Sequence, residues 1–142
     1  MSARPRSAPA VALVLAVGLA GCGGGSSGDP DDIEAIRAAA IAYARAMIDV
    51  DLDRACGLVV GLDRPVRAAG AESAPCADVL ANGANGSVRP TDRDLHRLRD
   101  ARITVSPGGR ARIALVGTDL PLRHVGSGWK VDFAAMRPGD VG

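Results

Sequence analysis

The stretch ARITVSPGGRARIAL, residues 101–115, marks the point where the repeat of the chain changes to a period of two. Apolar residues alternate with polar ones on both sides of Pro107-Gly108-Gly109, a combination that is typical of a turn. This pattern predicts two antiparallel strands that each bury one face. It decides the fold class because the segments before it carry helical patterns, so that helices precede a sheet.

Two further strands are expected downstream. Apolar residues alternate again over residues 120–124 and 129–133, which are separated by the turn Gly126-Ser127-Gly128. Pro121 predicts that the first of these strands lies at an edge of the sheet or starts irregularly, because proline donates no backbone hydrogen bond. The expected sheet is a curved antiparallel meander of about four strands.

The strongest helical signal lies upstream, in residues 33–50. Apolar side chains recur there at helical spacing, on one stripe made of Ile33, Ile36, Ala40, Tyr43, Met47 and Val50. Asp29 is placed to cap this helix, and Pro30 suits its first position. Shorter helices are expected over 52–60, over 74–80 and after residue 91, and their caps would be Asp51, Ser73 and Thr91, the last in a capping box with Asp94. The fold class is therefore α+β, with N-terminal helices packed on the sheet.

The N-terminus carries an export pattern. Arg4 and Arg6 precede the apolar run 11–20, which is too short to span a bilayer as a mature helix. The segment Leu19-Ala20-Gly21-Cys22 that follows resembles the bacterial lipobox, which implies that the Cys22 thiol is diacylated and that the chain is cut just before it. The alternative is an ordinary secretory signal cut near Ala20, with Cys22 left as a free thiol.

The resemblance to a lipobox implies a protein outside the cytoplasm, anchored in the cell membrane by lipid such as palmitate. The expected organisation is a lipoprotein signal peptide over residues 1–21, the lipidated Cys22 and a flexible tether over 22–30, an α+β domain over 31–134 and a C-terminal tail over 135–142. The glycine-rich composition of the stretch after Cys22 is typical of a flexible linker.

The charge balance of the sequence gives no sign of two classes of partner. The full chain carries 17 basic and 16 acidic residues, so the loss of Arg4 and Arg6 with the signal leaves a net charge of −1. Such a chain lacks the charge footprint of a nucleic-acid-binding protein and the polybasic patch that binds anionic lipid. Arginines and aspartates are interleaved between residues 89 and 102, which indicates a solvated face with local ion pairs.

Three motifs resemble the nuclear transport factor 2-like superfamily and, more narrowly, small actinobacterial lipoproteins with that fold. They are the closing strand GSGWKVDF at 126–133, the acidic turn and short helix DVDLDRAC at 49–56, and the segment CADVL at 76–80. The resemblance covers about residues 31–134. It implies a cone that encloses a pocket between the sheet and the long helix, which some members use for ligands or for ketosteroid-isomerase-like catalysis.

Cys56 and Cys76 remain once Cys22 is lipidated. An even pair of cysteines in an oxidising compartment favours a structural disulfide. A redox or metal pair is the alternative, but the chain has neither a Cys-x-x-Cys motif nor the further ligands of a zinc site.

His124 is the one weak candidate for a pocket residue, because it shares a face with Leu120 and Leu122. An inward histidine beside a carboxylate could act as a general base, whereas the simpler interpretation is a partly exposed residue at a strand end. Asp132 and Lys130 should face solvent, and Tyr43 should belong to the core. The sequence predicts no catalytic, cofactor-binding or metal-binding residues.

These observations favour a non-catalytic binding or accessory module of the cell envelope. Its partner would be an envelope protein or a small apolar ligand, and not nucleic acid. The alternatives are a ketosteroid-isomerase-like enzyme with an acid/base residue in the cone, and a structural interaction domain without a pocket.

Overall fold

A computed structural model describes residues 27–62, 75–82 and 89–136 of the chain. The expected signal peptide, Cys22, the tether up to residue 26, the Ser73 cap and the end of the C-terminal tail lie outside these residues. Among the helices of the described ranges, none is both long enough and apolar enough to cross a membrane.

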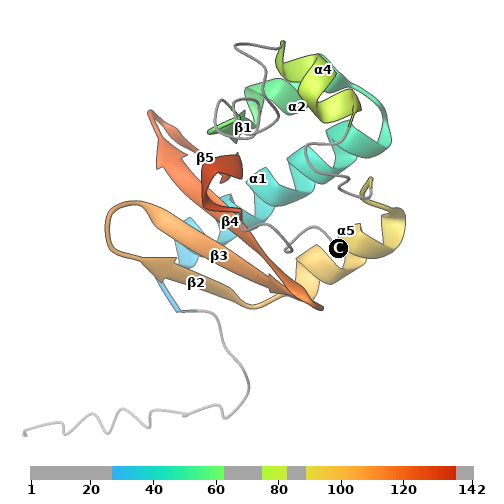
Figure 1. Cartoon of the computed structure of the whole chain (residues 1–142). Helices are drawn as coiled ribbons and strands as arrows, with labels where there is room; N and C mark the ends of the chain where they lie inside the picture. Colours follow the sequence, from blue (N-terminus) through green and yellow to red (C-terminus); the bar gives the residue numbers. More distant parts are fainter. Residues whose placement is uncertain (1–26, 63–74, 83–88, 137–142) are drawn as a thin grey trace, which may run out of the picture.

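Helices precede the main body of the sheet, so the expected α+β class is confirmed (Figure 1). The elements are α1 (Pro30–Ile48), α2 (Leu52–Gly57), β1 (Val59–Val60), α4 (Cys76–Ala81), α5 (Asp92–Asp100), β2 (Ile103–Ser106), β3 (Arg110–Leu115), β4 (Thr118–Val125), β5 (Gly128–Asp132) and the 3-10 helix η1 (Phe133–Ala135).

The sheet is mixed and five-stranded, in the order β1-β5-β4-β3-β2. Strands β2 to β5 form the expected antiparallel meander, but β1 adds a strand that runs parallel to β5. The prediction of four strands was wrong because Val59 and Val60 were assigned to the end of a helix. Helix α2 stops at Gly57, and the backbone N–H of Val131 donates to the carbonyl of Leu58 at 2.9 Å. Val59 and Val60 thus pair with the edge of β5, and as β-branched residues they favour a strand.

Pro121 does not mark an edge strand, because β4 lies between β3 and β5. The N–H of His124 donates to Gly109 on the β3 side, and N–H groups alternate along a strand, so the nitrogen of Pro121 points to the β5 side. Pairing with β5 extends only to Leu122, opposite Val131. At Pro121, β4 is therefore no longer paired with β5, and no β5 carbonyl needs the N–H that proline lacks. This explains why a proline is tolerated in a strand that lies inside the sheet.

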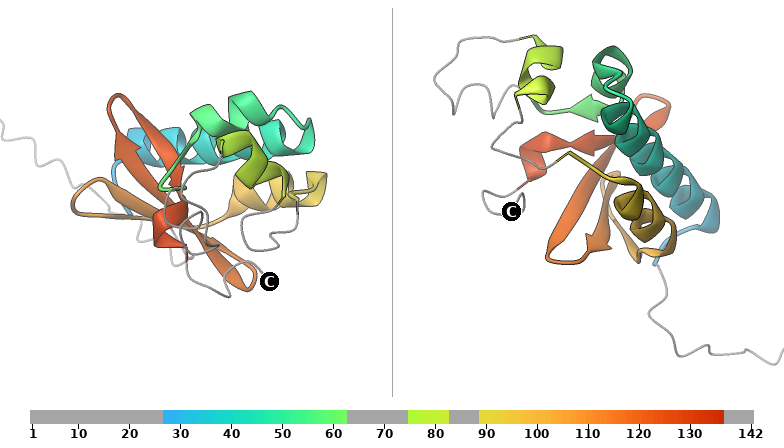
Figure 2. Two further views of the ribbon diagram at one scale, coloured as in Figure 1. Left: turned by 45° about the horizontal axis from the view of Figure 1, so that its top comes forward. Right: turned by 90° about the vertical axis from the view of Figure 1, so that its right-hand side faces the viewer.

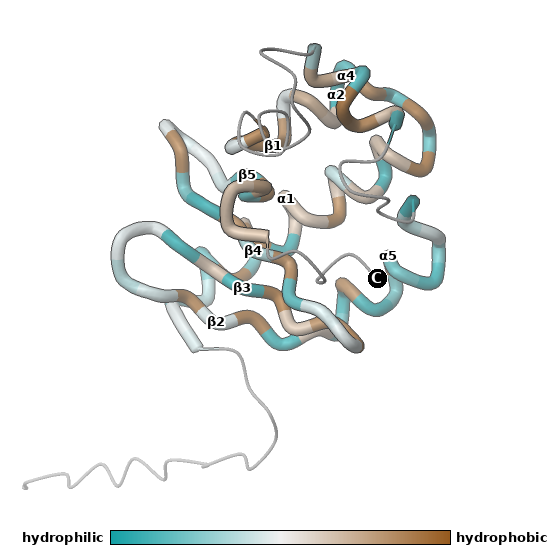
Figure 3. Tube along the Cα trace, viewed as in Figure 1, coloured by the Kyte–Doolittle hydropathy of each residue, from teal (hydrophilic) through white to brown (hydrophobic). Residues whose placement is uncertain are grey.

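Helices α1 and α5 lie together on one side of the sheet, as the right-hand view of Figure 2 shows. The strand residues facing them form an apolar inner face, which includes Ile103, Ala111, Ile113, Leu122 and Trp129. These side chains pack on Ile36, Ala40 and Ala44 of α1 and on Leu95 and Leu98 of α5. Polar and apolar positions alternate along the strands, which Figure 3 shows as changes between teal and brown. The other side of the sheet, called here the outer face, therefore carries the polar residues.

Helix α1 begins as expected, with Asp29 accepting a hydrogen bond from the Asp31 N–H at 2.9 Å and Pro30 in the first turn. Its end differs from the expectation, because Val50 is 50% exposed and lies off the buried stripe. The N–H of Asp51 bonds to the Ala46 carbonyl at 2.9 Å and that of Val50 to the Met47 carbonyl at 3.4 Å, which is the Schellman pattern. Val50 occupies the position where glycine is usual, with φ at 60°.

Helix α5 is held at both ends. The Thr91 N–H and hydroxyl donate to the Asp94 carboxylate at 2.8 and 2.7 Å, in the predicted capping box. These hydrogen bonds lower the pKa of Asp94. At the other end, Nη1 of Arg37 on α1 donates to the carbonyls of Leu98 and Ala101 at 2.6 and 3.1 Å. A cation thus satisfies carbonyls that the helix leaves unpaired and ties α5 to α1.

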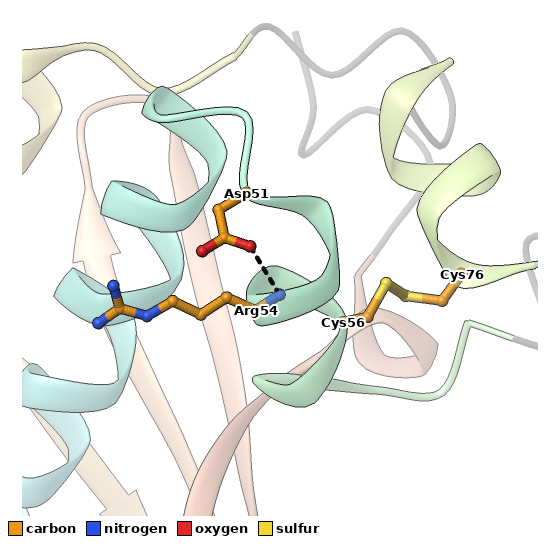
Figure 4. Close-up of a disulfide and its surroundings, with 4 residues drawn as sticks. All are labelled: Asp51, Arg54, Cys56 and Cys76. Atoms are coloured by element: carbon orange, nitrogen blue, oxygen red, sulfur yellow. Dashed lines mark hydrogen bonds between the residues drawn. A yellow bond between two sulfur atoms is a disulfide. The ribbon is translucent and has the colours of Figure 1, made fainter.

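A second core cluster lies at the β1 end of the molecule, around Met47, Leu80 and Phe133. The sulfurs of Cys56 and Cys76 lie 2.03 Å apart, which agrees with the expected disulfide and joins α2 to α4 (Figure 4). Asp51 caps α2 by accepting from the Arg54 N–H at 3.2 Å. Each of these helices has 6 residues, too few to be stable without packing or a cross-link.

Candidate functional site

His124 lies at the exposed end of β4. Its ring stands edge-on to Trp129, its partner on β5, with the ring centres 5.3 Å apart. Among the described residues, no carboxylate lies within ion-pair distance of it. The structure thus places His124 beside the core, at an exposed strand end.

Tyr43 belongs to the core, as expected. Its ring meets Phe133 edge-on with centres 6.2 Å apart, and burial raises its pKa to about 12. The phenol therefore stays protonated at neutral pH.

The layer between α1 and the sheet is filled with side chains. Ile36 of α1 and Ile103, Ile113 and Val131 of the sheet are all 0% exposed. Where the resemblance implied a pocket, these described side chains are buried in the core.

A hollow lies on the outer face of the sheet. It has a volume of about 500 Å³, and β2 to β5, the β2–β3 turn and η1 contribute to its lining. Its polar side chains are Ser106, Arg110, Arg112, Arg123 and Asp132. We call this feature the arginine hollow.

Strand register brings the cations of the outer face together. Arg123 on β4 stands directly opposite Arg110 on β3 and directly opposite Lys130 on β5. Like charges placed directly across a sheet repel one another, so we expect this row of cations to lower stability. Arg112 lies on β3 as well, two residues along from Arg110, and faces the same side.

Only part of this positive charge is neutralised. Asp132 lies 3.3 Å from Nε of Arg123 and also accepts from Nη2 at 3.4 Å. Arg112 has a distant and exposed partner in Asp119, at 3.8 Å. Within the part of the chain that the structure describes, Arg110 has no carboxylate in ion-pair range.

Asp132 differs from the expectation of a solvent-facing residue. It does face the outer side, but it is only 6% exposed and its partner is Arg123. It also caps η1, because its Oδ1 accepts from the Ala134 N–H at 3.1 Å. Gly61 allows this packing: a Cβ there would lie 2.7 Å from Ala134 and 3.0 Å from the Asp132 carboxylate, and φ is +75°. The chain after β1 therefore passes close to the Asp132 carboxylate.

The side chains of the arginine hollow offer hydrogen-bond donors and positive charge. Guanidinium groups donate hydrogen bonds and stay charged, so they recognise anions but do not transfer protons at neutral pH. The single carboxylate is already engaged by Arg123 and Ala134. No group of three or more potential metal ligands occurs in the described ranges.

Sequence reasoning missed this site. Arg110 and Arg112 alternate with the buried Ala111 and Ile113, so their outward direction could be predicted. Their meeting with Arg123 depends on the register between β3 and β4, which the sequence pattern leaves open.

No family model, curated protein or solved structure matches this chain.

Proposed function

We propose that the chain is an extracytoplasmic lipoprotein, anchored in the cell membrane through Cys22, whose domain is a non-catalytic module that binds an anionic group on the outer face of its sheet. The observation that carries the proposal is the arginine hollow, where Arg110 has no ion-pair partner among the described residues and Arg112 has only a long, exposed one. The lipobox-like segment before Cys22 supports the anchor.

The proposal includes a fold of the nuclear transport factor 2-like kind. In its support, a long helix crosses a sheet in the order β1-β5-β4-β3-β2, and short helices precede the meander. The filled layer beneath α1 favours an interaction role over binding of a small apolar ligand inside a cone.

The ketosteroid-isomerase-like alternative has less support. His124 is exposed and packs on Trp129, and Tyr43 is a core residue whose high pKa follows from burial. Neither residue lines the arginine hollow. An acid/base role would need a second titratable group beside one of them.

Processing of the full chain in a bacterial host tests the anchor. We expect a mature N-terminus at Cys22 that carries diacylglycerol, measured by mass spectrometry, and recovery in the membrane fraction. Cys22→Ala should remove both, whereas Gly23→Ala should remove neither. An unmodified N-terminus at any other residue would refute the proposal.

A further inference from the structure

The point where the tether joins the domain is fixed. Ser27 pairs with the free edge of β2: its N–H donates to Ile103 at 2.9 Å, and its carbonyl accepts from Val105 at 2.9 Å. Gly28 follows at φ +140° and approaches so closely that a Cβ there would lie 2.6 Å from a methyl group of Val105. The chain therefore meets the domain at the β2 edge, beside the hairpin that borders the arginine hollow.

The tether is too short to hold the domain far from the bilayer. Each residue adds at most about 3.6 Å, so Cys22 and Ser27 are separated by no more than about 18 Å. From Ser27 to Arg110 the path crosses two strand spacings and runs two residues along the sheet, which is on the order of 12 Å. The arginine hollow is thus within reach of the surface in which Cys22 is anchored.

We propose that the arginine hollow binds the phosphate of anionic phospholipid headgroups in the same membrane that holds the Cys22 lipid. This inference rests on the proposed function, because the anchor supplies the proximity. Arginine matches phosphate oxygens with paired hydrogen bonds, and a phosphate between Arg110 and Arg123 would relieve their mutual repulsion. The domain would then rest with its outer face toward the bilayer and with α1 and α5 facing away.

Two features together favour anionic headgroups as the ligand: the positive charge of the arginine hollow and the short tether. Attraction between exposed charges is screened beyond about 10 Å, so a patch of this size needs its partner close by. The tether supplies that closeness, because it makes the encounter with headgroups intramolecular. The sequence lacks a polybasic run, and the fold replaces one by gathering cations from separate strands.

Arginine labelling in lipid nanodiscs tests the proposal. The mature lipoprotein is reconstituted in discs of phosphatidylcholine and in discs that also contain phosphatidylglycerol, and phenylglyoxal modification is followed at each arginine. We expect labelling of Arg110 and Arg112 to slow by about fivefold in the anionic discs, the factor that one basic residue contributes near such a surface. Labelling of Arg93 and Arg99, which are exposed on α5, should not change.

Matched variants separate the hollow from total charge. Arg110→Gln with Arg112→Gln should abolish the protection of Arg123 in anionic discs, whereas Arg93→Gln with Arg99→Gln, an equal loss of charge, should preserve it. Labelling that is the same in both discs, with Cys22 diacylated, would overturn the lipid inference and leave the proposed function standing. Protection by inorganic phosphate or by an acidic protein, without an effect of phosphatidylglycerol, would also overturn it. A Cys22 without lipid would overturn the proposed function itself.

Discussion

The two faces of the sheet differ in what their side chains do, although they alternate along the same strands. Ile113 on the inner face is 0% exposed beneath the helices, whereas its neighbour Arg112 is exposed on the outer face. The inner face is filled by aliphatic groups, and the outer face gathers like charges that repel one another. Because side chains alternate between the faces of a strand, the inner residues stabilise the fold and the outer residues remain available for interactions.

The largest effect should come from truncating the inner face. Ile113→Ala removes a fully buried side chain and should lower the free energy of unfolding by about 3 kcal/mol, because it leaves a cavity in a packed layer. The adjacent Arg112→Ala should change it by less than about 0.5 kcal/mol, since its ion pair is long and exposed. Urea denaturation of both variants measures the contrast, and equal losses would contradict the division between faces.

The disulfide should matter almost as much. Replacing Cys56 and Cys76 together with serine frees a loop of 20 residues and should cost about 3 kcal/mol in the chain-entropy model. The loss should appear in thermal unfolding, and reduction of the unmutated protein should reproduce it. An unchanged melting temperature would mean that the second core cluster holds α2 and α4 without the cross-link.

A substitution at Val50 should increase stability, in contrast to the two losses above. Its exposed side chain adds nothing to the inner layer, and its left-handed backbone is strained. Val50→Gly should therefore stabilise the protein by about 1 kcal/mol, after allowance for the greater freedom of glycine when unfolded. Val50→Ala is the control, since alanine keeps most of the backbone penalty. A loss of stability with glycine would show that the Val50 side chain makes a contact that matters.

The smallest effect should come from the outer face. Arg110→Thr removes one like-charge neighbour of Arg123 and should raise stability by about 0.5 kcal/mol at low salt. Lys130→Thr removes the neighbour on the other side and should act in the same direction. Differential scanning calorimetry at low and high salt would measure both gains, which should shrink as salt screens the repulsion. A loss in either variant would mean that these cations stabilise the fold.

Local patterns were sufficient to predict the elements that depend on nearby residues. The meander, the Asp29 cap and the capping box of Thr91 with Asp94 all follow from periodicity or from spacing of a few residues. The pairing of Cys56 with Cys76 followed from their number and compartment, and the structure agrees with it.

Predictions failed where a distant segment decides the outcome. Val59 and Val60 looked like the end of a helix, but the edge of β5 supplies the hydrogen-bonding partners of a strand. Asp132 looked solvated, but Arg123 and the Gly61 backbone bury it. The arginine hollow could not be predicted for the same reason, because it exists only in the register that sets Arg110 opposite Arg123.

The bridge between Ser27 and β2 also protects the protein from its own copies. An open edge strand is a template on which another chain can add. On the proposed lipid anchor, molecules confined to a plane would also meet one another often. Ser27 occupies the outward carbonyl of Ile103 and the outward N–H of Val105, so these two groups of the short strand are already paired. Ser27 thereby hinders aggregation by edge-to-edge pairing of sheets at β2.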